Sequence, residues 1–110
     1  MRTKKADIII ANGGNDYIRA LGGDDCIYAG EGDDFIRAGN GNDIIHADSG
    51  DDMIISGPGE DTVYAGLGDD RIFEMHKGDS NIIDGGDGTD MCLTAKKRVS
   101  VTSTNCEITS

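Results

Sequence analysis

The chain has 110 residues, of which 21 are Asp or Glu and 10 are Lys or Arg, so its formal net charge is −11. A chain this acidic repels phosphate groups, which argues against nucleic acid or an anionic membrane as a partner and favours cations. The longest apolar run, from Ile8 to Ala11, has four residues, whereas a membrane span needs about 18.

Residues 1–5 are basic like the start of a signal peptide, but the apolar stretch behind them is too short, so no export signal is visible. From Ala11 to Phe73 the chain divides into seven uninterrupted nine-residue units. Position 4 is always Gly, position 6 is always Asp, position 8 is Ile or Val, and position 1 is Ala or Ser. Asp7 and Ile9 extend the same phase backwards.

Three residues of each unit, such as Tyr17 to Arg19, are predicted to form a short strand with one side chain inward and two outward. The other six must turn, and glycine at positions 2 and 4 permits the positive φ that a tight turn needs. Two units make one coil of 18 residues, and successive coils stack as parallel strands roughly 4.8 Å apart. We therefore predict an all-β fold, a right-handed parallel β-roll (a β-solenoid).

After Phe73 the phase shifts. Gly78 and Ile82 recover the Gly and Ile spacing one residue late, with Ser80 where Asp is expected, and residues 85–93 form a last full unit after a second inserted residue. Residues 94–110 contain no Gly and are rich in Thr, Ser and Val, and we expect a strand over residues 98–104 to close one end. The predicted organisation is a β-roll over 1–93, irregular from 74, and a C-terminal cap segment over 94–110.

Stacking places each position-6 Asp directly above the Asp that lies 18 residues later. One side of the roll then carries Asp7, Asp25, Asp43 and Asp61, and the other carries Asp16, Asp34, Asp52 and Asp70. At about 5 Å and an effective dielectric near 20, neighbouring carboxylates repel by roughly 3 kcal/mol, so six pairs sum to ~20 kcal/mol as an unscreened upper bound. A folded domain is stable by only about 5 to 15 kcal/mol. Cations must therefore lie between successive aspartates on each side of the roll.

The ligand types predict which cation binds. Carboxylates and carbonyls exposed by glycine turns are hard oxygen donors, which suit calcium better than magnesium, whereas zinc prefers clustered Cys or His. Five Asp pairs form regular sites, and Asp7 with Asp25 is a sixth candidate, in which Lys5 replaces the position-4 glycine. Six divalent ions would change the net charge from −11 to +1, and five would leave −1. We therefore expect five or six calcium ions.

The units resemble the RTX, or hemolysin-type, calcium-binding nonapeptide GGxGxDxUx over residues 7–93. The resemblance implies a β-roll in which each ion lies between the turns of units n and n+2, held by both position-6 Asp residues and by main-chain carbonyls of positions 1 to 4. Carried onto this sequence, the carbonyl ligands include Gly13, Gly22, Gly30, Gly32, Gly39, Gly41, Gly50, Gly57, Gly59, Gly66 and Gly68. The resemblance also implies a secreted or cell-surface protein that is disordered in the low-calcium cytoplasm and folds outside it.

Other features leave alternatives open. The position-5 acids, such as Asp24 and Asp33, are interpreted as solvated turn tips rather than ligands. Two stripes of outward side chains reflect either favourable stacking between strands or a docking surface for a neighbouring domain or a second copy. One stripe is Tyr17, Phe35 and Met53, and the other is Ile8, Cys26 and Ile44. Cys92 and Cys106 are a candidate disulfide that would clamp the cap.

The predicted function is a non-catalytic calcium-binding module that folds on calcium binding and belongs to a larger secreted protein. An enzyme is not expected, because the sequence has no HExxH motif, nucleophile elbow or P-loop. The alternative is a structural, adhesive or docking module of a secreted enzyme, toxin or adhesin that uses the exposed strand faces. The expected partners are calcium ions and a neighbouring domain of a longer parent chain.

Overall fold

The computed structural model describes residues 7–74, 80–94, 100–104 and 107–109, and every regular element in these ranges is a β-strand. The strands are β1 (Ile8–Ile10), β2 (Tyr17–Arg19), β3 (Cys26–Tyr28), β4 (Phe35–Arg37), β5 (Ile44–His46), β6 (Met53–Ile55), β7 (Thr62–Tyr64), β8 (Arg71–Glu74), β9 (Ser80–Asp84), β10 (Met91–Thr94), β11 (Ser100–Thr104) and β12 (Glu107–Thr109). Within these ranges there is no helix long and apolar enough to cross a membrane.

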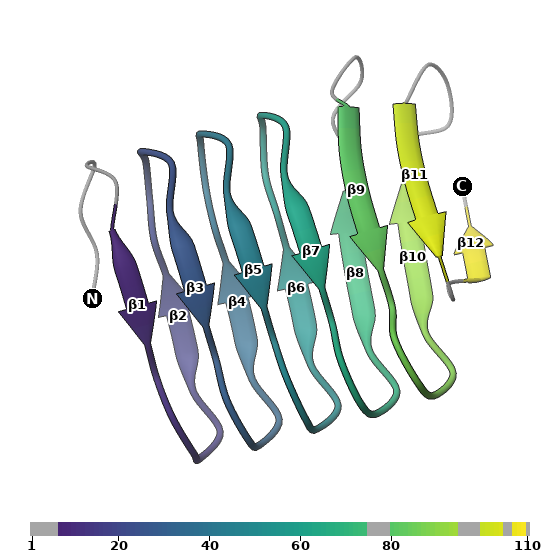
Figure 1. Ribbon diagram of the computed structural model, residues 1–110, viewed down its shortest axis with the longest axis horizontal. Coiled ribbons are helices and arrows are strands. Elements are labelled where there is room, and N and C mark those ends of the chain that lie inside the picture. Colours follow the sequence, from purple (N-terminus) through teal and green to yellow (C-terminus); the bar gives the residue numbers. More distant parts are fainter. Residues whose placement is uncertain (1–6, 75–79, 95–99, 105–106, 110) are drawn as a thin grey trace.

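Consecutive strands alternate between two parallel sheets. The odd sheet has the order β1-β3-β5-β7-β9-β11, and the even sheet has the order β12-β10-β8-β6-β4-β2. Figure 1 looks onto the odd sheet, with the even sheet fainter behind it and the turns along two opposite edges. The molecule is a flat slab with extents of 33 × 30 × 14 Å. The predicted all-β parallel β-roll is confirmed.

The nine-residue period explains the core. From β1 to β10 each strand directs one apolar side chain between the sheets, and these side chains, from Ile9 to Cys92, are at most 5 % exposed. The position-1 alanines from Ala20 to Ala65 are completely buried at the bases of the turns, where Ser56 takes the place of one alanine. From β1 to β9 each strand therefore contributes one large apolar side chain, and each turn from Ala20 to Ala65 contributes one small side chain.

The strand register corrects one detail of the sequence prediction. Strands pair 18 residues apart as far as β7, so that Ile27 lies opposite Ile45, but β7 and β9 pair 20 residues apart, with Val63 opposite Ile83. Ile83 is therefore buried and Ile82 is 49 % exposed. The spacing of Gly78 and Ile82 predicts Ile82 at the inward position. This prediction is wrong because both inserted residues precede β9 instead of being divided between the two sides of that strand.

The last strands continue the two sheets. β11 pairs in parallel with β9, which confirms a strand in the predicted 98–104 region. β12 pairs in parallel with β10, and the sequence pattern does not predict this strand. Cys92 is buried in the core beside these strands. Its candidate disulfide partner, Cys106, lies outside the described residues.

Candidate metal centre

The turns that carry the predicted ligands favour glycine for two separate reasons. Position 4 is glycine in every turn and has positive φ, as in Gly32 (112°), a region that residues with a Cβ avoid. Position 2 also has positive φ, as in Gly30 (89°), but Asn12, Leu21 and Asp48 adopt it too. In addition, a Cβ on Gly30 would overlap the main-chain carbonyl of Asn12, and one on Gly32 would overlap that of Gly14. Consecutive turns therefore stack closely, with main-chain carbonyls of one turn directed at the next.

The position-6 aspartates line up as predicted along the two turn edges. Each line of aspartates along an edge forms a ladder. Within it one carboxylate oxygen, Oδ1, accepts a hydrogen bond from the main-chain N–H of the Asp one coil earlier. Asp16 N donates to Asp34 Oδ1 at 2.8 Å, and Asp34 N donates to Asp52 Oδ1 at 2.8 Å. Asp7 joins the other ladder by donating its N–H to Asp25 Oδ1 at 2.9 Å. These bonds fix the direction in which the accepting carboxylates, such as those of Asp25, Asp34 and Asp52, point.

The second carboxylate oxygen of these residues is buried without a hydrogen bond. This applies to Oδ2 of Asp16, Asp25, Asp34, Asp43, Asp52, Asp70 and Asp90. The residues from Asp25 onwards in this set are at most 3 % exposed. An unsatisfied buried polar atom costs about 1–3 kcal/mol, and more when it is charged. A row of such oxygens therefore fits a bound cation, which would supply the missing positive partner.

The pKa values of the ladder carboxyls also show that burial disfavours their charged form. Loss of hydration on burial raises the pKa of Asp43 to about 7 and that of Asp52 to about 8. The accepted main-chain hydrogen bond lowers each pKa in part, and neighbouring ladder carboxylates raise it further. The pKa of Asp70 is raised to about 7 for the same main reason, and burial also raises the pKa values of Asp25, Asp34 and Asp90. Without a cation, the folded chain disfavours the charged ladder.

The position-5 residues form a second ladder with the opposite direction. Asn15 Oδ1 accepts from the main-chain N–H of Asp33 at 2.8 Å, and Asp33 Oδ1 accepts from that of Asp51 at 2.9 Å. These side chains are exposed, as the interpretation as turn tips requires. Because Asn15 and Asn42 make the same bond as the acids, a negative charge is not needed there.

The structure places the sequence-predicted residues in two groups. Asp16, Asp34, Asp52 and Asp70 follow one edge, and Asp7, Asp25, Asp43 and Asp61 follow the other. The glycines of the predicted carbonyl set lie in the same turns, at positions 2, 3 and 4. Among the described residues no cluster of three or more His, Cys, Asp or Glu side chains is positioned to hold a metal ion. In the scheme that the sequence resembles, the remaining oxygen ligands are main-chain carbonyls.

One residue of the ladder was missed from the predicted ligand set. Asp90 Oδ1 accepts from Asp70 N at 2.8 Å, so Asp90 extends the first edge across the inserted residues. Its signal was present in the unit from Gly85, where Asp90 occupies position 6. On the other edge the register aligns Asn81, not Ser80, with Asp61, because Ile82 N donates to Asp61 O. Neither residue is an aspartate, so that ladder has no further carboxylate of this type there.

The comparison with known families agrees with this geometry. A sequence model of the RTX calcium-binding nonapeptide repeat, four copies long, matches residues 3–36 and 37–72, more than half of the chain. The chain belongs to the RTX repeat family. Among curated proteins, none matches it. Membership means that this RTX chain binds calcium as a repeat module, and the buried carboxylate oxygens lie where the β-roll stacks its turns.

Proposed function

We propose that the chain is a non-catalytic RTX module that folds when it binds calcium outside the cell, as part of a larger secreted protein. The observation that carries this proposal is the row of buried Oδ2 atoms without hydrogen bonds. A carboxylate ladder at neutral pH is unfavourable in the folded state unless cations neutralise it. Calcium accepts six to eight oxygen ligands in flexible geometry, which suits carboxylates combined with turn carbonyls.

The proposed sites are the gaps between successive aspartates of each ladder. The ligands are the position-6 aspartates together with main-chain carbonyls of the turn glycines, such as Gly30 and Gly32. Six gaps have 18-residue spacing when Asp7/Asp25 is included and five when it is not, which gives five or six ions. The hydrogen bond between Asp70 and Asp90 supports one further candidate gap. Calcium at extracellular, millimolar concentration is the setting in which weak sites of this type fill.

Circular dichroism with a calcium titration tests the proposal. In chelator at pH 7.5 the chain should show a coil spectrum, and millimolar calcium should convert it to a β spectrum, whereas magnesium at the same concentration should not. Native mass spectrometry of the calcium form should count five to seven bound ions. A β-rich spectrum that chelator leaves unchanged would contradict the proposal.

A second candidate function is favoured by a separate observation. Large apolar side chains are exposed on the outer faces of the sheets, including Ile8 at 70 % and Tyr17 at 60 % exposure. Such surfaces are typical of interaction sites. They support a docking role for the folded module in addition to calcium binding.

A further inference from the structure

The two outer faces of the slab differ in charge. Within the described residues the cationic side chains are Arg19, Arg37 and Arg71, and all three belong to outward positions of the even sheet. The outward positions of the odd sheet from β1 to β7 carry no Asp, Glu, Lys or Arg. Most of the exposed large apolar side chains lie on that odd face: Ile8, Ile10, Tyr28, Ile44, Tyr64 and Ile82.

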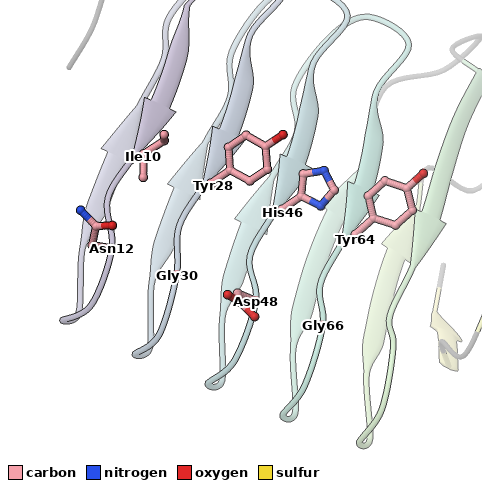
Figure 2. A pocket seen from close by; sticks show the side chains of 8 residues that line it. All are labelled: Ile10, Asn12, Tyr28, Gly30, His46, Asp48, Tyr64 and Gly66. Atoms are coloured by element: carbon pink, nitrogen blue, oxygen red, sulfur yellow. The ribbon is translucent and has the colours of Figure 1, made fainter.

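A groove of about 460 Å³ runs along the odd face, where the strands enter their turns. Figure 2 shows the side chains of Tyr28, His46 and Tyr64 in a row along it, with Asp48 below them. Along the turn side of the groove Asp48 lies between Gly30 and Gly66, so no neighbouring side chain lies beside its carboxylate in that row of turn residues. Among the lining residues Asp48 carries the one carboxylate, and in the described part of the chain it has no ion-pair partner.

The ring stack restricts what this groove binds. Tyr28 and His46 stack with centroids 4.8 Å apart, and His46 and Tyr64 stack at 4.9 Å. The rings therefore cover one another's faces, and a flat ligand cannot stack on the middle of the row. The ring edges remain, with tyrosine hydroxyl oxygens that accept hydrogen bonds. The Asp48 carboxylate at the edge of the groove suits a guanidinium group, which is planar and presents five N–H donors.

The even face of the same molecule carries such groups at the matching interval. Arg19 and Arg37 are register partners on neighbouring strands β2 and β4, as Tyr28 and His46 are on β3 and β5. Both rows thus repeat once per coil, at the ~4.8 Å spacing of neighbouring strands. Neither arginine has an ion-pair partner among the described residues.

We propose that folded copies of this chain stack face to face, with the Arg19–Arg37 row of one copy in the Tyr28–His46–Tyr64 groove of the next. The faces measure 33 × 30 Å, so about 1,000 Å² is the upper limit of the area covered per copy, compared with about 800 Å² per partner in a stable interface. Because the two contacting faces differ, the contact is heterologous and repeats along a stack. The proposal rests on the proposed function, since calcium is needed to fold the slab and to neutralise its net charge.

Sedimentation equilibrium in millimolar calcium tests this stacking. The average mass of the wild-type chain should rise with concentration above the monomer mass of 11.6 kDa. The variants Asp48→Arg and Arg19→Asp/Arg37→Asp should each weaken association by about tenfold or more, as loss of one interfacial ion pair would. An equimolar mixture of the two variants should associate again, because the reversed charges then face each other.

Two further variants keep the test decisive. Asp48→Asn removes the charge with a residue that tolerates the positive φ of 75° at this position, in case arginine disturbs the turn there. Glu60→Arg makes the same charge change at an exposed position of the opposite turn edge and should associate like the wild type. Circular dichroism in calcium checks the fold of each variant.

The outcomes separate the two proposals. A wild-type chain that is β-rich in calcium but monomeric at every concentration overturns the stacking alone. Association that both charge reversals leave intact, or a mixture that fails to associate, also overturns it, because the interface would then lie elsewhere. A chain that remains a coil in calcium overturns the proposed function and the stacking with it.

Discussion

Asp33 and Asp34 are neighbours in one turn, yet their carboxylates bond to opposite coils. Asp33 Oδ1 accepts from the following coil, at Asp51 N, and Asp34 Oδ1 accepts from the preceding coil, at Asp16 N. Asp33 is exposed, whereas Asp34 is 3 % exposed and its Oδ2 has no hydrogen bond. Only the buried member of the pair is expected to hold calcium.

This contrast gives a matched pair of substitutions. Asp34→Asn should raise the calcium concentration at the folding midpoint by about tenfold or more, because it removes a charged ligand shared by two gaps, and a charge-assisted bond contributes about 1.5–3 kcal/mol. Asp33→Asn should leave the midpoint near that of the wild type, since Asn15 and Asn42 already make the same bond. A calcium titration followed by circular dichroism measures both midpoints, and equal shifts would contradict the ligand assignment.

Ser56 is an exception to the alanine row, and the structure gives a reason for it. Its hydroxyl donates to Glu74 Oε2 at 2.6 Å, and both residues are at most 1 % exposed. Replacing Ser56 with the alanine found in the other six units should therefore destabilise the calcium-bound fold by about 1–3 kcal/mol, by removing a donor from a buried carboxylate. Thermal unfolding in calcium measures the effect. Ser49→Ala, in a partly exposed turn, is the control, and a wild-type melting temperature for Ser56→Ala would refute the explanation.

At the scale of the turn, close stacking of the coils makes glycine necessary at some positions and not at others. Gly32→Ala should destabilise the roll by more than about 2 kcal/mol, because alanine disfavours φ of 112° and its Cβ would overlap the Gly14 carbonyl. Gly13→Ala should be tolerated, since a Cβ there has nothing within 4 Å. Both substitutions leave the main-chain carbonyls in place. Thermal unfolding in calcium compares them, and equal losses would mean that glycine acts in another way.

The strand and turn elements were predictable to the extent that the nine-residue period is local. Period and glycine placement determine which residue of each strand is inward, and this holds from Ile9 to Ile72. They do not determine where two inserted residues are accommodated, because Ile82 and Ile83 are adjacent and either could fill the core. Pairing with β7 decides between them. The position-5 hydrogen bonds and the ring stack of Tyr28, His46 and Tyr64 likewise arise from contacts between coils, which a single unit does not reveal.

At the scale of the whole molecule, protons and calcium compete for the same buried carboxylates. Burial raises the pKa values of Asp43, Asp52 and Asp70 to about 7 or 8 in the folded state, whereas in the unfolded chain they lie near 3.8. The metal-free roll therefore binds protons more tightly than the unfolded chain does. This contribution to its stability is complete below about pH 4 and is lost as the pH rises through 7 to 8.

In chelator, β structure should consequently increase as the pH falls from 8 towards 4, whereas in millimolar calcium it should already be present at pH 8. Calcium needs ionised carboxylates, so its midpoint concentration should rise as the pH falls. Circular dichroism across this pH range, with and without chelator, measures both trends. The triple variant Asp43→Asn/Asp52→Asn/Asp70→Asn removes three of the titrating groups, and its metal-free form should depend less on pH between 8 and 6. A metal-free chain that remains a coil throughout would show that burial of these carboxyls does not control folding.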